Sequence, residues 1–290
     1  MGSSLQEANP TQATPVETAV TIVRRRADRR LITRVVRTGG TSGWEGAAEI
    51  GPDAWQAGGV SEETNQPSGD PPFVRPTGRA GQAYLVRPGE NADGPGPGVL
   101  VLHSWWGLTP GIKEYCNRLS EEGFVVLAPD LLRGVVPDTA AEAEFELSES
   151  DPNSTAALVL ASTVTLRSVT EHPDGPVAII GFSMGASWAL WAATRQPESF
   201  SKVVAHYGTQ HIDFSTLTAQ VQGHFAQHDT LVSADDLVEF ESDLFELGHE
   251  PEFWHYEGTR HWFAEAGHDE FFDSDAAELA WQRTLAFLKR

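Results

Sequence analysis

The stretch VAIIGFSMG, residues 177–185, decides the fold. Its four leading apolar residues run directly into the pattern G-x-S-x-G, and a helix-forming run from Ala186 to Arg195 follows. A buried strand that turns sharply into a helix is the setting in which this pattern forms a nucleophile elbow. The two glycines leave room for the turn, and the N-terminus of the helix lies beneath the developing oxyanion. We therefore predict that Ser183 is a nucleophile.

Short apolar runs alternate with amphipathic segments on both sides of this elbow. The alternation of strand and helix predicts an α/β fold with a mostly parallel central sheet and helices on both faces. We expect strands over Gln82–Val86, Val99–His103, Phe124–Ala128, Val177–Gly181, Lys202–His206, Val221–Gln227 and Glu252–Tyr256. We expect helices over Pro110–Glu122, Thr155–Val169, Met184–Arg195, Ala234–Leu247 and Ala276–Lys289.

The acid and the base that an elbow needs follow it in the chain, in the order Ser, Asp, His. Asp229 comes just after the predicted strand Val221–Gln227, where the acid is expected. Asp235 and Asp236 are alternatives, but they fall within the next predicted helix. Asp229 could instead cap that helix, a role that Ser233 or Asp235 could also fill.

The base is expected in the loop after the last strand, where His261 lies. His268 is the alternative further along this loop. His255 falls within the strand, where a structural role is expected. His103 and His206 end other strands, and we expect each either to line a pocket or to be satisfied by local hydrogen bonds.

Four motifs of the chain resemble those of the dienelactone hydrolase family. They are VLHSWWGL at 101–108, EGFVVLAPDL at 122–131, GFSMG at 181–185 and YEGTRHWF at 256–263. The resemblance covers residues 81–290 and implies an α/β-hydrolase fold that cleaves esters and lactones with a nucleophile, a His and an Asp. Carried over by motif, this triad is Ser183, His261 and Asp229. The resemblance also implies that the backbone N–H groups of Met184 and Trp105 form the oxyanion hole, and that no metal or organic cofactor is required.

Two positions depart from the family pattern. Dienelactone hydrolases use cysteine where this chain has Ser183, and they have a glutamate where it has Ser104. A serine nucleophile can be activated by His261 alone, so the two changes are consistent with each other. They point to a serine esterase or lactonase that works through an acyl-enzyme. Two alternatives remain open: activity on enol-lactones despite the serine, and a non-catalytic interaction module on the same fold.

Residues near the predicted oxyanion loop and base are candidates for substrate binding. Aromatic side chains at Trp105, Trp106 and Trp262 are expected to form an apolar pocket, and Ser104 lies beside them in the chain. Arg260 is a candidate for binding a substrate carboxylate. The acidic segment from 139 to 151 has only a loose pattern and is a candidate lid.

Charge and composition exclude several classes of binding partner. The net charge of −21 argues against nucleic acid and anionic membrane surfaces, because both are bound by clustered Lys and Arg. The single cysteine, Cys116, excludes an internal disulfide and cysteine-rich zinc sites. We expect a cytoplasmic protein, monomer or homodimer, whose partner is a small ester or lactone.

The charge also divides the chain into two parts. Residues 1–40 hold seven Arg and three acids, a net charge of +4, whereas residues 41–290 hold 13 basic and 38 acidic groups, a net charge of −25. Up to about residue 76 the composition is rich in Gly, Pro, Ser and Thr, which is typical of poorly structured segments. We predict that residues 1–76 form a low-complexity, partly basic extension, and that residues 77–290 form the catalytic domain.

Overall fold

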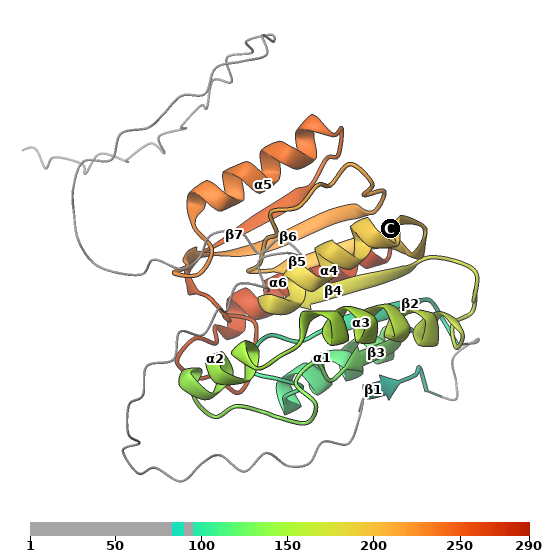
Figure 1. Cartoon of the computed structure of the whole chain (residues 1–290), viewed down its shortest axis with the longest axis horizontal. Coiled ribbons are helices and arrows are strands. Elements are labelled where there is room, and N and C mark those ends of the chain that lie inside the picture. The colour runs from blue at the N-terminus through green and yellow to red at the C-terminus, as the bar shows by residue number, and fades with distance from the viewer. Residues whose placement is uncertain (1–82, 90–94) are drawn as a thin grey trace, which may run out of the picture. The chain divides into compact units, whose positions relative to one another are not determined.

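A computed structural model describes residues 83–89 and 95–290 of the chain (Figure 1). The predicted extension, residues 1–76, and the first residues of the predicted domain lie outside the described residues. The division of the chain at residue 76 therefore stays a prediction.

The described part of the chain is built on a seven-stranded sheet with the order β1-β3-β2-β4-β5-β6-β7 (Figure 1). Strand β1 pairs antiparallel with β3, and every other neighbouring pair is parallel. The predicted α/β fold with a mostly parallel sheet is confirmed. The strands are β1 (Ala83–Val86), β2 (Gly98–Leu102), β3 (Val125–Pro129), β4 (Val177–Phe182), β5 (Phe200–His206), β6 (Gln220–His228) and β7 (Glu252–Arg260).

Helices cover both faces of the sheet, as the near-continuous apolar strands require. Alternate residues of β2 and β4 point into two separate cores, one on each face. One core contains residues of α1 and α6, and the other contains residues of α3, α4 and α5. The helices are α1 (Pro110–Glu121), α2 (Ala140–Ser148), α3 (Pro152–Arg167), α4 (Met184–Arg195), α5 (Ala234–Glu246) and α6 (Ser274–Leu288), with a short 3₁₀ turn at Pro197–Ser199.

Most helices begin at a side chain that accepts a hydrogen bond from the first turn. Thr109 caps α1, and Asp151 caps α3 ahead of Pro152, which explains why α3 begins three residues earlier than expected. Ser233 and Asp236 form a reciprocal capping box on α5. The exception is α4, because its N-cap residue Ser183 makes no side-chain capping bond. The hydroxyl of that serine is engaged elsewhere.

Two further elements differ from the sequence-based expectation. The loosely patterned acidic segment contains the helix α2, capped by Thr139, although Ala143 is its only buried residue. Strand β7 continues four residues beyond Tyr256 to Arg260, so that His261 is the first residue of the loop after the strand. No helix in the described ranges is both long and apolar enough to cross a bilayer.

Candidate active site

The turn between β4 and α4 holds Ser183 in a strained conformation. Its φ of 51° and ψ of −116° lie where an L-residue rarely rests, at a cost of about 1–3 kcal/mol. The turn is fixed by a hydrogen bond from the Ser183 N–H to the carbonyl oxygen of His206, 2.9 Å away. A Cβ on Gly181 would clash with the backbone of Gly185 and Ala186, so no larger residue fits there without a shift. The sequence forms a tight turn from strand to helix with Ser183 at its apex, and the role of Ser183 as a nucleophile stays a prediction.

Ser183, His261 and Asp229 form a continuous hydrogen-bonded chain. The Ser183 Oγ lies 2.7 Å from the His261 Nε2, and the His261 Nδ1 lies 2.7 Å from the Asp229 Oδ2. The side chains of His261 and Asp229 are each only 4% exposed, so water barely reaches the second of these bonds. The three residues follow β4, β6 and β7, whose carboxyl ends meet at one edge of the sheet.

Asp229 also organises its own loop. Its Oδ1 accepts hydrogen bonds from the backbone N–H groups of Leu231 and Val232, at 2.8 and 2.9 Å. Asp229 does not cap α5, because Leu231 and Val232 precede the helix and Ser233 is its N-cap residue. Asp236 is occupied by the capping box with Ser233 and is not brought to His261.

The other strand-end histidines have different surroundings. The Nδ1 of His103 lies 2.6 Å from the carbonyl oxygen of Ser104, and its Nε2 accepts from the Leu131 N–H, so His103 is satisfied locally. His206 is buried between the rings of Phe182 and His224, at 4.5 and 4.6 Å. Neither of its ring nitrogens has a hydrogen-bond partner among the described residues, and burial lowers its pKa to about 3. Both histidines are thus held neutral in the core.

His255, for which a structural role is expected, is exposed on β7. The alternative base, His268, packs at a tilt against Trp106 with 4.5 Å between ring centroids, and burial lowers its pKa. Of His261 and His268, only His261 is within hydrogen-bond distance of the Ser183 hydroxyl.

The two residues whose backbone N–H groups are predicted to form an oxyanion hole lie at the start of α4 and after β2. Met184 is the first residue of α4, so its N–H has no acceptor within the helix. Trp105 is in the loop that follows β2. Gly185 brings the loop and the elbow together, because a Cβ there would clash with the carbonyl oxygens of Leu102 and His103.

Three tryptophans form a packed cluster beside this loop. Trp105 stacks on Trp262 at 5.2 Å, and Trp106 contacts both of them edge to face at 5.5 Å. Trp106 and Trp262 are buried, and Trp105 is half-buried. Their indole N–H groups find no acceptor within residues 83–89 and 95–290, so ring packing holds the cluster together. Arg260 is exposed and is not drawn into this cluster.

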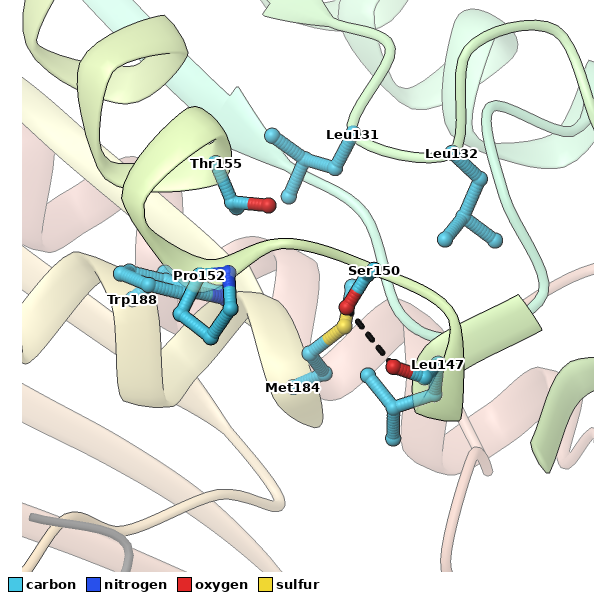
Figure 2. A pocket seen from close by; sticks show the side chains of 8 residues that line it. All are labelled: Leu131, Leu132, Leu147, Ser150, Pro152, Thr155, Met184 and Trp188. Atoms are coloured by element: carbon cyan, nitrogen blue, oxygen red, sulfur yellow. Dashed lines mark hydrogen bonds between the residues drawn. The ribbon is translucent and has the colours of Figure 1, made fainter. Parts of the chain in front are cut away.

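A small apolar cavity borders the elbow on the other side. Its volume of about 10 Å³ has room for roughly one water molecule. Figure 2 shows the side chains around it, with Met184 rising from the first turn of α4. The segment predicted as a lid contributes Leu147 and Ser150 to its wall, and the serine hydroxyl is fixed by a bond to the Leu147 carbonyl. The lining residues are Leu131, Leu132, Leu147, Ser150, Pro152, Thr155, Met184 and Trp188.

One buried acid, Glu265, was not predicted from the sequence. Its carboxyl group accepts hydrogen bonds from the hydroxyls of Ser104 and Tyr207, at 2.7 and 3.1 Å. Burial raises its pKa to about 7, although both hydroxyls favour the ionised form. Ser104, predicted to bind substrate, is itself fully buried against this carboxyl. No spacing rule singles out Glu265, because it is one acid among many in this part of the sequence.

The described residues contain no group of three or more His, Cys, Asp or Glu side chains arranged to hold a metal ion.

Comparison with known proteins finds similarity to a family of hydrolases. The model of the dienelactone hydrolase family matches residues 82–290. "Protein usf" of Aquifex pyrophilus is 29% identical over 203 residues, which cover 67% of this chain and 88% of the relative. The "Putative carboxymethylenebutenolidase" of Aquifex aeolicus is 28% identical over 204 residues, with the same coverage. A crystal structure described as a "Putative Dienelactone Hydrolase" from Klebsiella pneumoniae has a TM-score of 0.63 and 25% identity, covering 72% of this chain and 92% of that chain.

The close approach at Gly185 generates a stability prediction. Gly185→Ala should lower the free energy of unfolding by about 1–3 kcal/mol or more, since the added methyl meets fixed carbonyl groups rather than a flexible side chain. Urea unfolding followed by circular dichroism measures the change. Gly89→Ala is the matched control, because open space surrounds that position and the change should stay within about 0.5 kcal/mol. Equal stability of the two variants would contradict the packing described for the elbow.

Proposed function

The chain belongs to the dienelactone hydrolase family, and we propose that it is a serine hydrolase that cleaves carboxylic esters or lactones through an acyl-enzyme on Ser183. The observation that carries this proposal is the pair of 2.7 Å contacts that join Ser183 to His261 and His261 to Asp229. A nucleophile, a base and a group that orients the base are thereby held in the order that acyl transfer needs.

In the first step His261 acts as the general base. Its Nε2 takes the proton from the Ser183 hydroxyl while the Oγ attacks the carbonyl carbon of the ester. The Asp229 carboxylate accepts from the Nδ1–H, which fixes the tautomer and stabilises the imidazolium that forms. His261 then gives the proton to the leaving alcohol, and the acyl group stays on Ser183.

In the second step water replaces the alcohol. His261 removes a proton from the water as it attacks the acyl-enzyme, and returns that proton to the Ser183 Oγ as the acid departs. In both steps the negative charge of the tetrahedral intermediate falls near the N–H groups of Met184 and Trp105. One such donor contributes roughly 3–4 kcal/mol of transition-state stabilisation in comparable enzymes.

The sole cysteine of the chain supports serine as the nucleophile. Cys116 lies on α1, fully buried in the hydrophobic core. Burial raises the pKa of its thiol to about 12, so the reactive thiolate is absent at neutral pH. We therefore assign to Ser183 the nucleophilic role that a cysteine has in the family pattern.

The cavity beside Met184 suggests a preference for short acyl groups. Met184, which directly follows Ser183 in the chain, is one of the lining residues of this cavity. The cavity holds about one water molecule, so it can take only a short alkyl chain without a shift of α2. We propose acetyl and propanoyl esters as preferred substrates, with α2 as the movable wall.

Enol-lactones are the second candidate substrates. This alternative is supported by the name of two relatives, each called "Putative carboxymethylenebutenolidase". Arg260, which was a candidate for holding a substrate carboxylate, is exposed, and this weakens the case for a charged lactone.

We further propose that residues 77–290 are the catalytic domain and that the extension takes no part in chemistry. Every residue with a proposed role lies between Ser104 and Glu265.

Removal of the Ser183 hydroxyl tests the proposed function. Ser183→Ala should lower kcat for p-nitrophenyl acetate by about 10⁴–10⁶-fold, because no other group can form the acyl-enzyme. A fluorophosphonate probe should label the wild-type protein at Ser183 and leave the variant unlabelled. Ser201→Ala, which removes an exposed hydroxyl from β5, should retain both labelling and turnover. Undiminished activity in Ser183→Ala would rule the proposal out.

Enlargement of the cavity tests the acyl preference. Leu147→Ala removes part of the wall, and should raise kcat/KM for the hexanoyl ester relative to the acetyl ester roughly tenfold. Leu279→Ala, a truncation of an exposed leucine on α6, should leave the ratio unchanged. The measurement is a series of p-nitrophenyl esters of increasing chain length. A ratio that moves equally in both variants would show that this cavity does not receive the acyl group.

A comparison of substrate classes separates the two candidate activities. The uncharged esters should be hydrolysed with a kcat/KM at least about tenfold above that of a carboxylate-bearing enol-lactone, since no Lys or Arg within residues 83–89 and 95–290 is buried and could hold the carboxylate. The reverse order would favour the enol-lactonase alternative.

A further inference from the structure

Glu265 is a buried carboxyl that the proposed reaction does not use. It lies in the loop after His261, and only 2% of the residue is exposed. A carboxyl is rarely buried in this way unless hydrogen bonds compensate for the lost hydration. Its partners therefore indicate what the carboxyl does.

The two carboxyl oxygens bind hydroxyls from two other strand ends. The Ser104 hydroxyl, after β2, donates to Oε2 at 2.7 Å, and the Tyr207 hydroxyl, after β5, donates to Oε1 at 3.1 Å. The Ser104 Oγ in turn accepts from the backbone N–H of Trp106 at 3.2 Å. One carboxyl thus ties together three loops that meet at the same edge of the sheet.

Each of these contacts leads to a group of the proposed mechanism. Ser104 immediately precedes Trp105, whose amide is a proposed oxyanion donor. The ring of Tyr207 packs on the ring of His261, with 5.0 Å between their centroids. Tyr207 is held in a left-handed conformation with a φ of 39°, so its position depends on its contacts. A change at Glu265 can reach both the oxyanion loop and the base.

The hydrogen-bond directions suit the ionised carboxyl. A carboxylate accepts from both hydroxyls, and such charge-assisted bonds are roughly twice as strong as neutral ones. A protonated carboxyl has to donate its own proton to one of the two hydroxyl oxygens, and that hydroxyl then loses its acceptor. Protonation therefore loosens one of the two ties.

Five other titratable groups buried in the core keep one charge state at neutral pH. Burial lowers the pKa of His103 after β2, of His206 on β5 and of His224 on β6, so all three are neutral. Burial raises the pKa of Tyr207 and of Tyr115 on α1, so both phenols stay protonated. On its own loop, Glu265 shares the neighbourhood with His261, through Tyr207, and with His268, whose pKa is lowered.

We propose that Glu265 is a positioning residue whose ionised carboxyl locks the oxyanion loop and the base loop together, so that turnover requires Glu265 as well as His261 to be deprotonated. This inference rests on the proposed function. It adds a second proton to those that must leave the enzyme before it is active. Because burial sets the pKa of Glu265 near 7, the requirement falls within the physiological range.

The dependence of kcat/KM on pH tests the proposal. For the wild-type protein acting on p-nitrophenyl acetate, the logarithm of kcat/KM should rise with a limiting slope of about 2 on the acid side, because two protons must be lost. Glu265→Gln keeps the shape of the side chain but cannot ionise. Its slope should fall to about 1, and its kcat/KM on the alkaline plateau should be roughly tenfold below that of the wild type.

A matched variant controls for the loss of one negative charge. Glu270→Gln makes the same change at an exposed position in the same loop, and should keep the slope of about 2. A slope of about 1 in the wild type, or of about 2 in Glu265→Gln, would overturn the proposal. A purely structural role for Glu265 would lower the plateau of Glu265→Gln and leave its slope equal to that of the wild type.

Tyr207→Phe is a second variant, in case Glu265→Gln does not fold. It removes one of the two donors to the carboxylate, which raises the pKa of Glu265 and moves the acid limb of the profile to a higher pH. An unmoved limb would contradict the proposal. Labelling of the wild type by a fluorophosphonate distinguishes a failure of the role of Glu265 from a failure of the proposed function. A labelled, active enzyme with the wrong slope defeats only the role of Glu265, whereas an unlabelled, inactive protein defeats the proposed function and this inference with it.

Discussion

The close approach of backbone to backbone at the end of β4 is the constraint on which the rest of the site depends. Gly181 and Gly185 let the first turn of α4 lie against the end of β2, and between them Ser183 is held at a φ of 51°. This conformation turns the hydroxyl away from its usual capping position, so that it bonds to His261 instead. The strain of about 1–3 kcal/mol is borne by a turn that is anchored on both sides by fully buried strands.

The parallel sheet then brings distant residues to this turn. Strands β2, β4, β5, β6 and β7 run in the same direction, so the loops after them gather at one edge. Ser183, Asp229 and His261 come from three of these loops, and Ser104 and Tyr207 from the other two. Glu265 forms hydrogen bonds with both Ser104 and Tyr207. It therefore links loops that the parallel strands bring close together but do not join.

Local signals made much of this predictable from the sequence. The elbow, the order Ser, Asp, His and the apolar runs predicted the fold and brought together three residues that the structure holds in one hydrogen-bonded chain. Glu265 had no such signal, since a buried acid looks like a surface acid until its neighbours are known. The cavity was also missed, because its walls come from α2, α3, α4 and the loop after β3, and α2 has one buried residue to mark it. The tryptophans that were expected to line a pocket pack largely on one another instead.

The central claim is that the Ser183 Oγ carries the acyl group during turnover. Rapid mixing of the protein with p-nitrophenyl acetate, acid quenching and peptide mass spectrometry test this directly. The expected result is a burst of p-nitrophenol close to one equivalent per active site, and a single acetyl group on the peptide that contains Ser183. Turnover without a burst and with no acetyl group on that peptide, or an acetyl group found on another residue, would contradict it.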